Sequence, residues 1–225
     1  MNKLSSKWKD YWKNIDDAKH RYNTNDWKKF YSKELSLFFL DEKQPALELG
    51  CGNGELIIPY LSRFSDYIGT DFSLTMLRTY KKCAPSVKLF CADASNLPLK
   101  NEMFGYIFSN GVCQYMNEDM LIRNLESVHD LLKKGGFYFI GNIPDKQLRF
   151  LYNANALRAD KSFSLYKMLK AEFFKYFRKY VQRKIDDIWY SRRFISELAS
   201  SCGFSCKTFS SLSYEYRFHA LLKKE

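Results

Sequence analysis

Residues 47–54 read Leu-Glu-Leu-Gly-Cys-Gly-Asn-Gly, and this stretch decides the fold. An apolar strand runs into it, and glycine then occupies alternate positions at 50, 52 and 54. Glycine adopts backbone angles that other residues resist and lets a ligand approach the main chain closely. We predict a helix over 55–61, whose first N–H groups have no partner within the helix. This is the geometry of a nucleoside-cofactor loop at the carboxyl end of a first strand.

The spacing of the glycines excludes two common phosphate-binding loops. A dinucleotide-binding loop needs its third glycine five residues after the first, where this chain has Glu55. A glutamate there would crowd and repel a pyrophosphate. The Gly-Lys-Ser/Thr pattern of a phosphate loop is also absent. The remaining interpretations are a loop for a cofactor without phosphate and a glycine-rich turn that binds nothing.

Further strands and acids follow at regular intervals. Residues 66–71 read as a second strand that ends in Asp71, 21 residues after Gly50. An acid about 20 residues beyond the loop binds ribose hydroxyls in doubly wound folds. We predict a third strand over 87–94 with Asp93 near its end. A fourth strand is predicted over 104–109 and a fifth over 137–143, after a helix stopped by Gly135 and Gly136.

In this order, over residues 46–143, the segments resemble the motifs of the class I S-adenosylmethionine (SAM)-dependent methyltransferases. The first motif of that superfamily reads acidic-x-Gly-x-Gly-x-Gly. The resemblance implies SAM as cofactor, whose sulfonium and amine are cationic and suit nearby acids. It implies an α/β fold with a single doubly wound, mostly parallel seven-stranded sheet of the Rossmann-like type. The chain is similar to the members of the superfamily that methylate small molecules.

The resemblance also assigns roles to residues around the cofactor. The loop would meet the methionine and ribose, Asp71 both ribose hydroxyls, and Phe72 the adenine. Met76 either lines the adenine slot or packs in the core. The cofactor-binding residues implied within the core are Glu48, Gly50, Cys51, Gly52, Gly54, Asp71, Phe72, Met76, Asp93, Ala94 and Asn110.

We interpret residues 1–225 as one domain with four parts. Residues 1–40 form an N-terminal helical lid, and 41–143 form the SAM-binding core. Residues 144–189 form a basic, aromatic helical insert before the sixth strand, and 190–225 form the final helix and strands six and seven. The resemblance places the seventh strand antiparallel.

The lid supplies further candidates. Apolar residues at helical spacing over 8–15 predict an amphipathic helix, and a second helix is predicted over 26–39. Arg21 has the fork geometry to bind the carboxylate of the methionine moiety, and Tyr11 or Tyr22 would close the pocket. The alternative is that the aromatic residues of this segment pack against the sheet.

The net charge of +11 is unevenly distributed. Residues 144–193 carry thirteen Lys/Arg against five Asp/Glu, whereas 34–143 carry ten against thirteen. A basic region outside the cofactor-binding core attracts anionic partners, so we expect a small anionic methyl acceptor. The alternatives for the insert are a membrane surface, a nucleic acid, a dimer contact or an ordinary solvated surface.

Methyl transfer requires the acceptor, methyl and sulfur to be held in line, and a hydroxyl acceptor also needs a base. His20, at the edge of the lid, is the candidate base. Gln114 stands where many small-molecule relatives have histidine; it can orient an acceptor but cannot take its proton. His129 and His219 are expected to be structural. We expect O-methylation of a phosphorylated or nucleotide-linked sugar or a natural-product intermediate; the alternatives are an RNA or phospholipid methyltransferase and a non-catalytic SAM-binding subunit.

The six cysteines contain no CxxC pair and do not match the histidines at metal-ligand spacing. We therefore expect reduced thiols and no metal site. The first residues lack the apolar region of a signal peptide, and no apolar run approaches about 20 residues. We expect a cytoplasmic protein.

Overall fold

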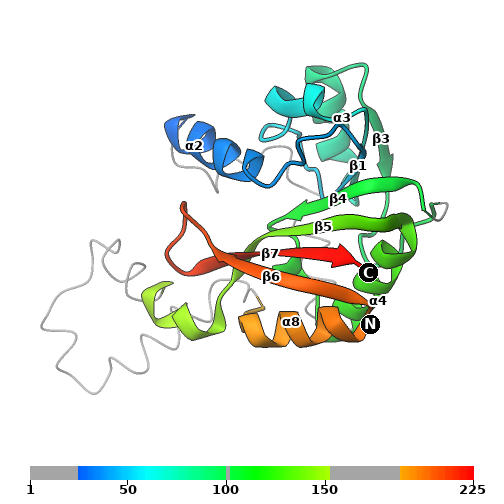
Figure 1. The fold of residues 1–225 in the computed structure, drawn as a ribbon. Coiled ribbons are helices and arrows are strands. Elements are labelled where there is room, and N and C mark those ends of the chain that lie inside the picture. Colours follow the sequence, from blue (N-terminus) through cyan, green and yellow to red (C-terminus); the bar gives the residue numbers. More distant parts are fainter. Residues whose placement is uncertain (1–24, 100–101, 153–187) are drawn as a thin grey trace, which may run out of the picture.

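The computed structural model describes residues 25–99, 102–152 and 188–225. Its centre is a seven-stranded sheet in the order β3-β2-β1-β4-β5-β7-β6 (Figure 1). Strands β1 to β5 pair in parallel, and β7 is antiparallel to both β5 and β6. The predicted fold is therefore confirmed. The strands are β1 (Pro45–Leu49), β2 (Asp66–Asp71), β3 (Lys88–Cys91), β4 (Phe104–Asn110), β5 (Leu132–Pro144), β6 (Phe204–Ser210) and β7 (Arg217–Lys224).

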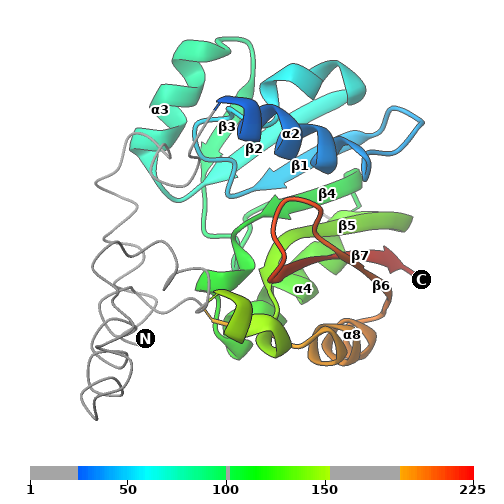
Figure 2. The same ribbon diagram turned by 90° about the vertical axis from the view of Figure 1, so that its left-hand side faces the viewer.

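Helices cover both faces of the sheet (Figures 1 and 2). One core lies between the sheet and α4 and α8, and a second lies between the sheet and α2, η2 and α3. Tyr106 and Phe108 of β4 point into the second core and Ile107 into the first, as the alternation of side chains along a strand requires. The helices are α2 (Asn25–Ser36), η2 (Ile58–Arg63), α3 (Leu74–Cys83), η3 (Cys113–Tyr115), α4 (Glu118–Leu131), η4 (Lys146–Leu148) and α8 (Arg192–Ser201).

The chain places β2 and β3 on one side of β1, and β4 and the later strands on its other side. The strand order thus reverses between β1 and β4. In open α/β sheets, ligands bind outside the carboxyl ends of the strands at such a point. The fold therefore directs attention to the segments that follow β1, β2 and β4.

Two predicted elements are wrong in type or extent. The helix predicted over 55–61 is a set of turns followed by the 3-10 helix η2. Pro59 has no N–H for a helical hydrogen bond, and the N–H groups of Ile57 and Ile58 both donate to the Gly54 carbonyl at 3.0 Å, which winds the chain tightly. The helix expected to stop at Gly135 ends at Leu131, and β5 begins at the next residue.

The strand ends also differ from the prediction. The third strand covers only 88–91 of the predicted 87–94. The sequence places the seventh strand over 214–222, whereas the strand begins at Arg217. Residues 211–216 instead form the loop between β6 and β7, which the Ser211 N–H closes by donating to the Arg217 carbonyl at 3.0 Å. The predicted helix over 8–15 and most of the insert lie outside the described residues.

The loop after β1 needs glycine for different reasons at different positions. Gly52 and Gly54 have φ angles of 55° and 75°, in the left-handed region that glycine favours. A Cβ atom on Gly54 would lie 2.3 Å from the ring of Tyr80 on α3, whereas one on Gly52 would meet nothing within 4 Å. The loop is therefore packed against α3 at Gly54 and open at Gly52.

We expect Gly54→Ala to lower the free energy of unfolding by about 3 kcal/mol, from left-handed strain plus overpacking against Tyr80. Gly52→Ala introduces the left-handed backbone strain without overpacking, and it should lower the free energy of unfolding by about 1 kcal/mol. Urea denaturation of the ligand-free proteins measures both. Equal losses for the two variants would contradict the packing described at Gly54.

Candidate active site

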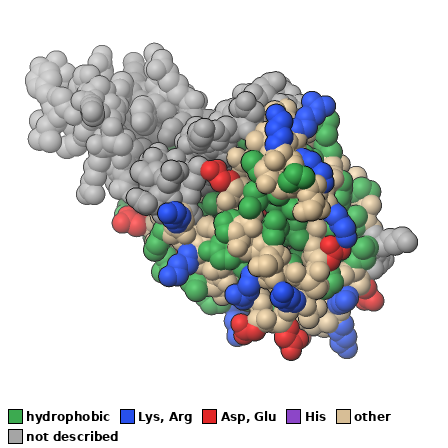
Figure 3. All heavy atoms as spheres, turned by 90° about the horizontal axis from the view of Figure 1, so that it is seen from above, with side chains coloured by type: hydrophobic (Ala, Val, Ile, Leu, Met, Phe, Trp, Pro, Cys, Tyr) green, Lys and Arg blue, Asp and Glu red, His purple; other side chains and the backbone are tan. Residues whose placement is uncertain are grey.

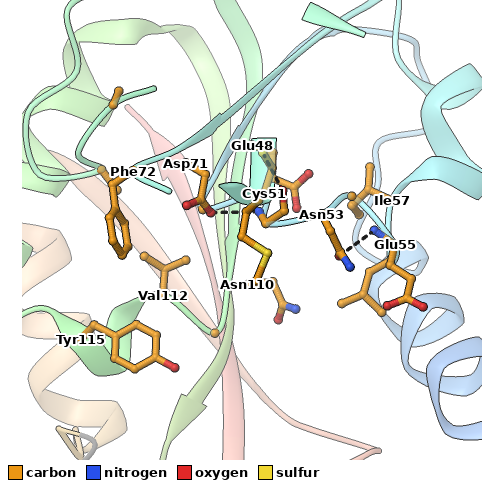
Figure 4. A pocket seen from close by; sticks show the side chains of 18 residues that line it. Glu48, Cys51, Asn53, Glu55, Ile57, Asp71, Phe72, Asn110, Val112 and Tyr115 are labelled. Atoms are coloured by element: carbon orange, nitrogen blue, oxygen red, sulfur yellow. Dashed lines mark hydrogen bonds between the residues drawn. The ribbon is translucent and has the colours of Figure 1, made fainter. Parts of the chain in front are cut away.

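A cavity opens at the carboxyl ends of β1, β2 and β4, where the strand order reverses (Figure 4). Its walls come from the glycine loop, the segment after β2, the turn after β3 and the segment after β4. The lining residues are Glu48, Gly50, Cys51, Gly52, Asn53, Gly54, Glu55, Leu56, Ile57, Asp71, Phe72, Met76, Ala92, Ala94, Asn110, Gly111, Val112 and Tyr115.

Asp71 joins the end of β2 to the glycine loop. Its Oδ2 accepts the N–H of Gly52 at 2.9 Å, and its Oδ1 accepts the N–H of Ser73 at 2.8 Å. Burial raises the pKa of Asp71, and the backbone N–H donors of Ser73, Gly52 and Phe72 oppose that rise. The carboxylate is thus fixed in one orientation at the cavity wall, facing the loop (Figure 4).

Glu48 lies beneath the loop and is only 4% exposed. Its Oε2 accepts a hydrogen bond from the hydroxyl of Tyr67, which in turn accepts one from Tyr80 at 3.3 Å. Burial raises the pKa of Glu48 to about 8. The hydrogen bond from Tyr67 lowers this pKa, and the negative charge of Asp71 raises it. Glu48 therefore carries a proton at neutral pH in the ligand-free protein.

The chemistry of the lining residues fits SAM. Among the described residues of the wall, three side chains are carboxylic acids (Glu48, Glu55 and Asp71), and none is Lys or Arg. Such a wall attracts a cation and disfavours a phosphate. Opposite the loop, the wall has an apolar part that suits the planar face of a nucleobase, formed by Phe72, Met76, Ala92 and Ala94.

Most of the predicted cofactor residues line the cavity. Asp93 does not; its Oδ1 accepts the N–H and the hydroxyl of Ser95 at 3.0 and 2.8 Å, closing its own turn. Tyr11, His20 and Arg21 lie outside the described residues. The predicted residues that line the cavity are Glu48, Gly50, Cys51, Gly52, Gly54, Asp71, Phe72, Met76, Ala94 and Asn110.

Sequence reasoning missed several lining residues. Val112 and Tyr115 belong to the segment 110–115, in which the family resemblance assigns a role to Asn110 alone. A Cβ on Gly50 would lie 2.4 Å from Val112 Cγ2, so the two segments are in direct contact across the cavity floor. The turn η3 directs Tyr115 to the same wall (Figure 4). The position of Val112 and Tyr115 directly after β4 could have indicated that they line the cavity. Leu56 and Ile57 were missed because we predicted a helix over 55–61.

Gln114 lies behind the wall. Gln114 is only 1% exposed. Its Oε1 accepts a hydrogen bond from Arg217 Nη1 at 2.5 Å, and its Nε2 donates one to the Tyr115 hydroxyl at 2.7 Å. His219 is fully buried on β7 and bonds Glu34, and His129 packs against Phe204. Within the described ranges, no histidine lines the cavity.

In the part of the chain that the structure describes, no three His, Cys, Asp or Glu side chains are grouped to hold a metal ion. The six cysteines are free thiols, and burial raises the pKa of Cys51 and Cys113. Among the described helices, none has the length and apolar character needed to cross a bilayer.

The fold and the cavity together define the SAM-binding domain of a methyltransferase. Comparison with known proteins agrees: residues 46–136 match the family model described as "Methyltransferase domain". Demethylmenaquinone methyltransferase of Streptomyces avermitilis is 30% identical over 133 residues, which cover 54% of this chain and 55% of that protein. The chain spans about half the length, or less, of the curated relatives it matches.

Two solved structures cover nearly the whole chain. The PH0226 protein of Pyrococcus horikoshii has a TM-score of 0.68 at 16% identity and covers 95% of both chains. Magnesium protoporphyrin IX methyltransferase of Synechocystis, solved with bound SAH, has a TM-score of 0.65 at 13% identity, covering 99% of this chain and 100% of that one. Residues 46–136 thus match a methyltransferase domain, and the chain shares its fold with solved SAM-dependent methyltransferases. SAM is the cofactor that such a domain implies.

We expect Asp71→Ala to weaken SAM binding at least about 100-fold, because two charge-assisted hydrogen bonds that shape the loop are lost along with the carboxylate at the wall. Isothermal titration calorimetry measures the affinity. Asp66→Ala, at the other end of β2, is the matched control. It loses an exposed pair with Lys88 at 2.8 Å and a hydrogen bond from the Tyr67 N–H at 3.0 Å, both away from the cavity, and should bind SAM normally. Normal binding by Asp71→Ala would refute the assignment.

Glu48 makes stability depend on pH. Its folded pKa of about 8 exceeds the unfolded value of 4.5, so the unfolded chain releases this proton first as the pH rises. Stability contributed by the neutral acid is therefore present below pH 4.5 and is lost toward pH 8. Glu48→Gln keeps the shape without the titration. We expect its free energy of unfolding, relative to wild type, to rise by roughly 2–4 kcal/mol between pH 5 and pH 8.

Urea titrations of both proteins at several pH values measure this difference. The raised pKa of Asp71 contributes to both proteins and cancels in the comparison. Parallel pH profiles for wild type and Glu48→Gln would show that Glu48 is already ionised in the folded protein.

Proposed function

We propose that this protein transfers the methyl group of SAM to a small anionic biosynthetic intermediate, with oxygen as the accepting atom. A phosphorylated or nucleotide-linked sugar and a natural-product intermediate are the acceptor types we favour. A cytoplasmic location is part of the proposal. The observation that carries it is the position of Arg217 directly behind one wall of the cavity.

Arg217 begins β7 and reaches across β5 to the segment after β4. Its Nη1 donates to Gln114 Oε1 at 2.5 Å and to the Asn142 carbonyl at 2.9 Å, and its guanidinium lies 5.5 Å from the ring centroid of Tyr214. Amide oxygens and tyrosine faces hold a guanidinium in one orientation, and a guanidinium is always protonated in proteins. An anionic acceptor that approaches along this wall would come close to the cationic side chain of Arg217.

Gln114 links Arg217 to the cavity wall. With Oε1 held by Arg217, its amide must present Nε2 to the hydroxyl of Tyr115, a residue of the cavity wall. Tyr115 receives that hydrogen bond on its oxygen and is placed to contact an acceptor. In this proposal Gln114 is a positioning residue, and Tyr115 and Arg217 meet the acceptor.

The bound cofactor supplies an activated methyl group on a neutral leaving group. The chain's own residues have the task of holding the acceptor in line with it, and correct placement accounts for much of the rate in such reactions. The acidic wall and the glycine loop fix one side, and Tyr115 and Arg217 would fix the other. A hydroxyl acceptor also requires a proton acceptor. His20 remains our candidate and lies outside the described residues.

The basic insert keeps RNA or phospholipid acceptors in consideration, and the lack of an identified base keeps a non-catalytic SAM-binding subunit in consideration. Over the described part of one face, Lys and Arg are interspersed with acidic and apolar side chains (Figure 3). That mixed surface supports a local anion-recognition site more than a continuous track for a polymer.

The test is transfer of labelled methyl from SAM into a host extract separated into polar metabolites, glycans, RNA and lipids. We expect label in the polar or glycan fraction. Arg217→Gln should reduce that label at least about tenfold, equivalent to 1.4 kcal/mol, and leave the affinity for SAM within about threefold of wild type.

Arg193→Gln serves as the matched control, because Arg193 is exposed and pairs only locally with Glu197 at 2.7 Å in the described structure. Label confined to RNA or lipid would replace the small-acceptor proposal with a polymer or membrane one. SAM binding without label in any fraction would favour the non-catalytic subunit.

A further inference from the structure

A buried carboxylate fastens helix α2 to the far end of the chain. Glu34 is 3% exposed. Its Oε1 lies 2.9 Å from His219 Nε2 and accepts the N–H of Leu212 at 2.5 Å. Its Oε2 accepts the N–H of Ser213 at 3.0 Å and also the Ser213 hydroxyl. These donors come from β7 and from the loop before it, more than 170 residues away in sequence.

The histidine in this cluster has a fixed role. His219 Nδ1 accepts the N–H of Asn142 at 3.1 Å, so the ring carries its proton on Nε2 and donates it to Glu34. The ring also stacks on Phe139, with centroids 5.4 Å apart. Burial alone would raise the pKa of Glu34, but the hydrogen bonds from His219, Ser213 and Leu212 outweigh it and hold the pKa at about 2. Glu34 is thus an ionised anchor.

The turn of α2 that carries Glu34 also contacts the cofactor cavity. The Tyr31 hydroxyl donates to Asn110 Oδ1, and the Ser32 hydroxyl donates to the Leu56 carbonyl at 2.5 Å. Asn110 and Leu56 both line the cavity; Leu56 directly follows the glycine loop, and Asn110 ends β4. Because Tyr31 and Glu34 are three residues apart, they lie on one face of the helix.

The contact between Tyr31 and Asn110 also orients the amide of Asn110. Its oxygen is occupied by the phenol, so its NH₂ group is the part left to face the cavity. Two N–H donors at this wall suit the carboxylate of an amino-acid moiety. Rotation or withdrawal of α2 would remove the phenol and release the amide to turn over.

We propose that Glu34 is a positioning residue of the cofactor site, which holds α2 against the β6–β7 loop so that Tyr31 and Ser32 keep Asn110 and Leu56 in their SAM-binding positions. The role concerns the cofactor alone. Its test requires no methyl acceptor and is independent of the proposed substrate.

The variant is Glu34→Gln, which replaces acceptor oxygens with an amide that cannot accept all these donors. Calorimetric titration of the full chain should show SAM binding weakened by about tenfold or more, or 1.4 kcal/mol. Ile195→Ala is the control, because Ile195 is 2% exposed in the core on the other face of the sheet. It should lower the melting temperature and leave SAM affinity within about twofold of wild type.

A double-mutant cycle separates positioning from general support. Tyr31→Phe removes the hydrogen bond to Asn110 and should weaken SAM binding by about threefold or more. If Glu34 acts through Tyr31, the double variant should bind SAM no worse than Glu34→Gln alone, to within about twofold. Additive losses would overturn the proposal.

Ser213→Ala is a milder variant that removes one hydroxyl donor to Glu34 and keeps the backbone donors, so it remains informative if Glu34→Gln does not fold. We expect a loss of SAM affinity of about twofold to fivefold that disappears in the Tyr31→Phe background. Unchanged SAM affinity in folded Glu34→Gln or Ser213→Ala would reduce the cluster to a stabilising contact and overturn the proposal.

Discussion

The hydrogen bonds from Gly52 and Ser73 to the carboxylate of Asp71 join the ends of β1 and β2, and the rest of the cavity depends on that junction. A loop with several positive φ angles has many alternative conformations, and a buried carboxylate that accepts two backbone N–H groups selects one of them. The loop then lies against Val112 on one side and Tyr80 on the other. Cofactor recognition follows from a backbone arrangement more than from a set of long side chains.

The site combines an acidic cavity with a basic chain. The part of the cavity wall that the structure describes holds three carboxylic acids and no Lys or Arg, although the whole chain carries a net charge of +11. Neutralising Glu48 by burial reduces the repulsion from Asp71 that two adjacent carboxylates would otherwise produce. Arg217 supplies positive charge just behind the Tyr115 side of the wall. Under the proposed function, this division of charge would separate the cationic cofactor from an anionic acceptor within a short distance.

The order of strands and the cofactor loop were predictable from the sequence because they rest on local patterns: short apolar runs, glycine at alternate positions and an acid at a fixed distance. The errors arose where a single residue or a distant contact decided the outcome. Pro59 prevented an α-helix that the apolar pattern allowed. Asp93 closes its own turn through Ser95, which no spacing rule indicates. No local pattern indicates the role of Glu34, since its partners at 211–219 become neighbours only in the folded chain.

The anchor at Glu34 also has a consequence for the order in which the protein matures. All the described residues that line the cavity occur before position 116, so they leave the ribosome before the partners of Glu34, which lie at 212, 213 and 219. A nascent chain that has reached only the end of β6 would possess every described wall residue and still lack the contacts that hold α2. If Glu34 positions the cavity as proposed, tight SAM binding begins only after the β6–β7 hairpin has formed.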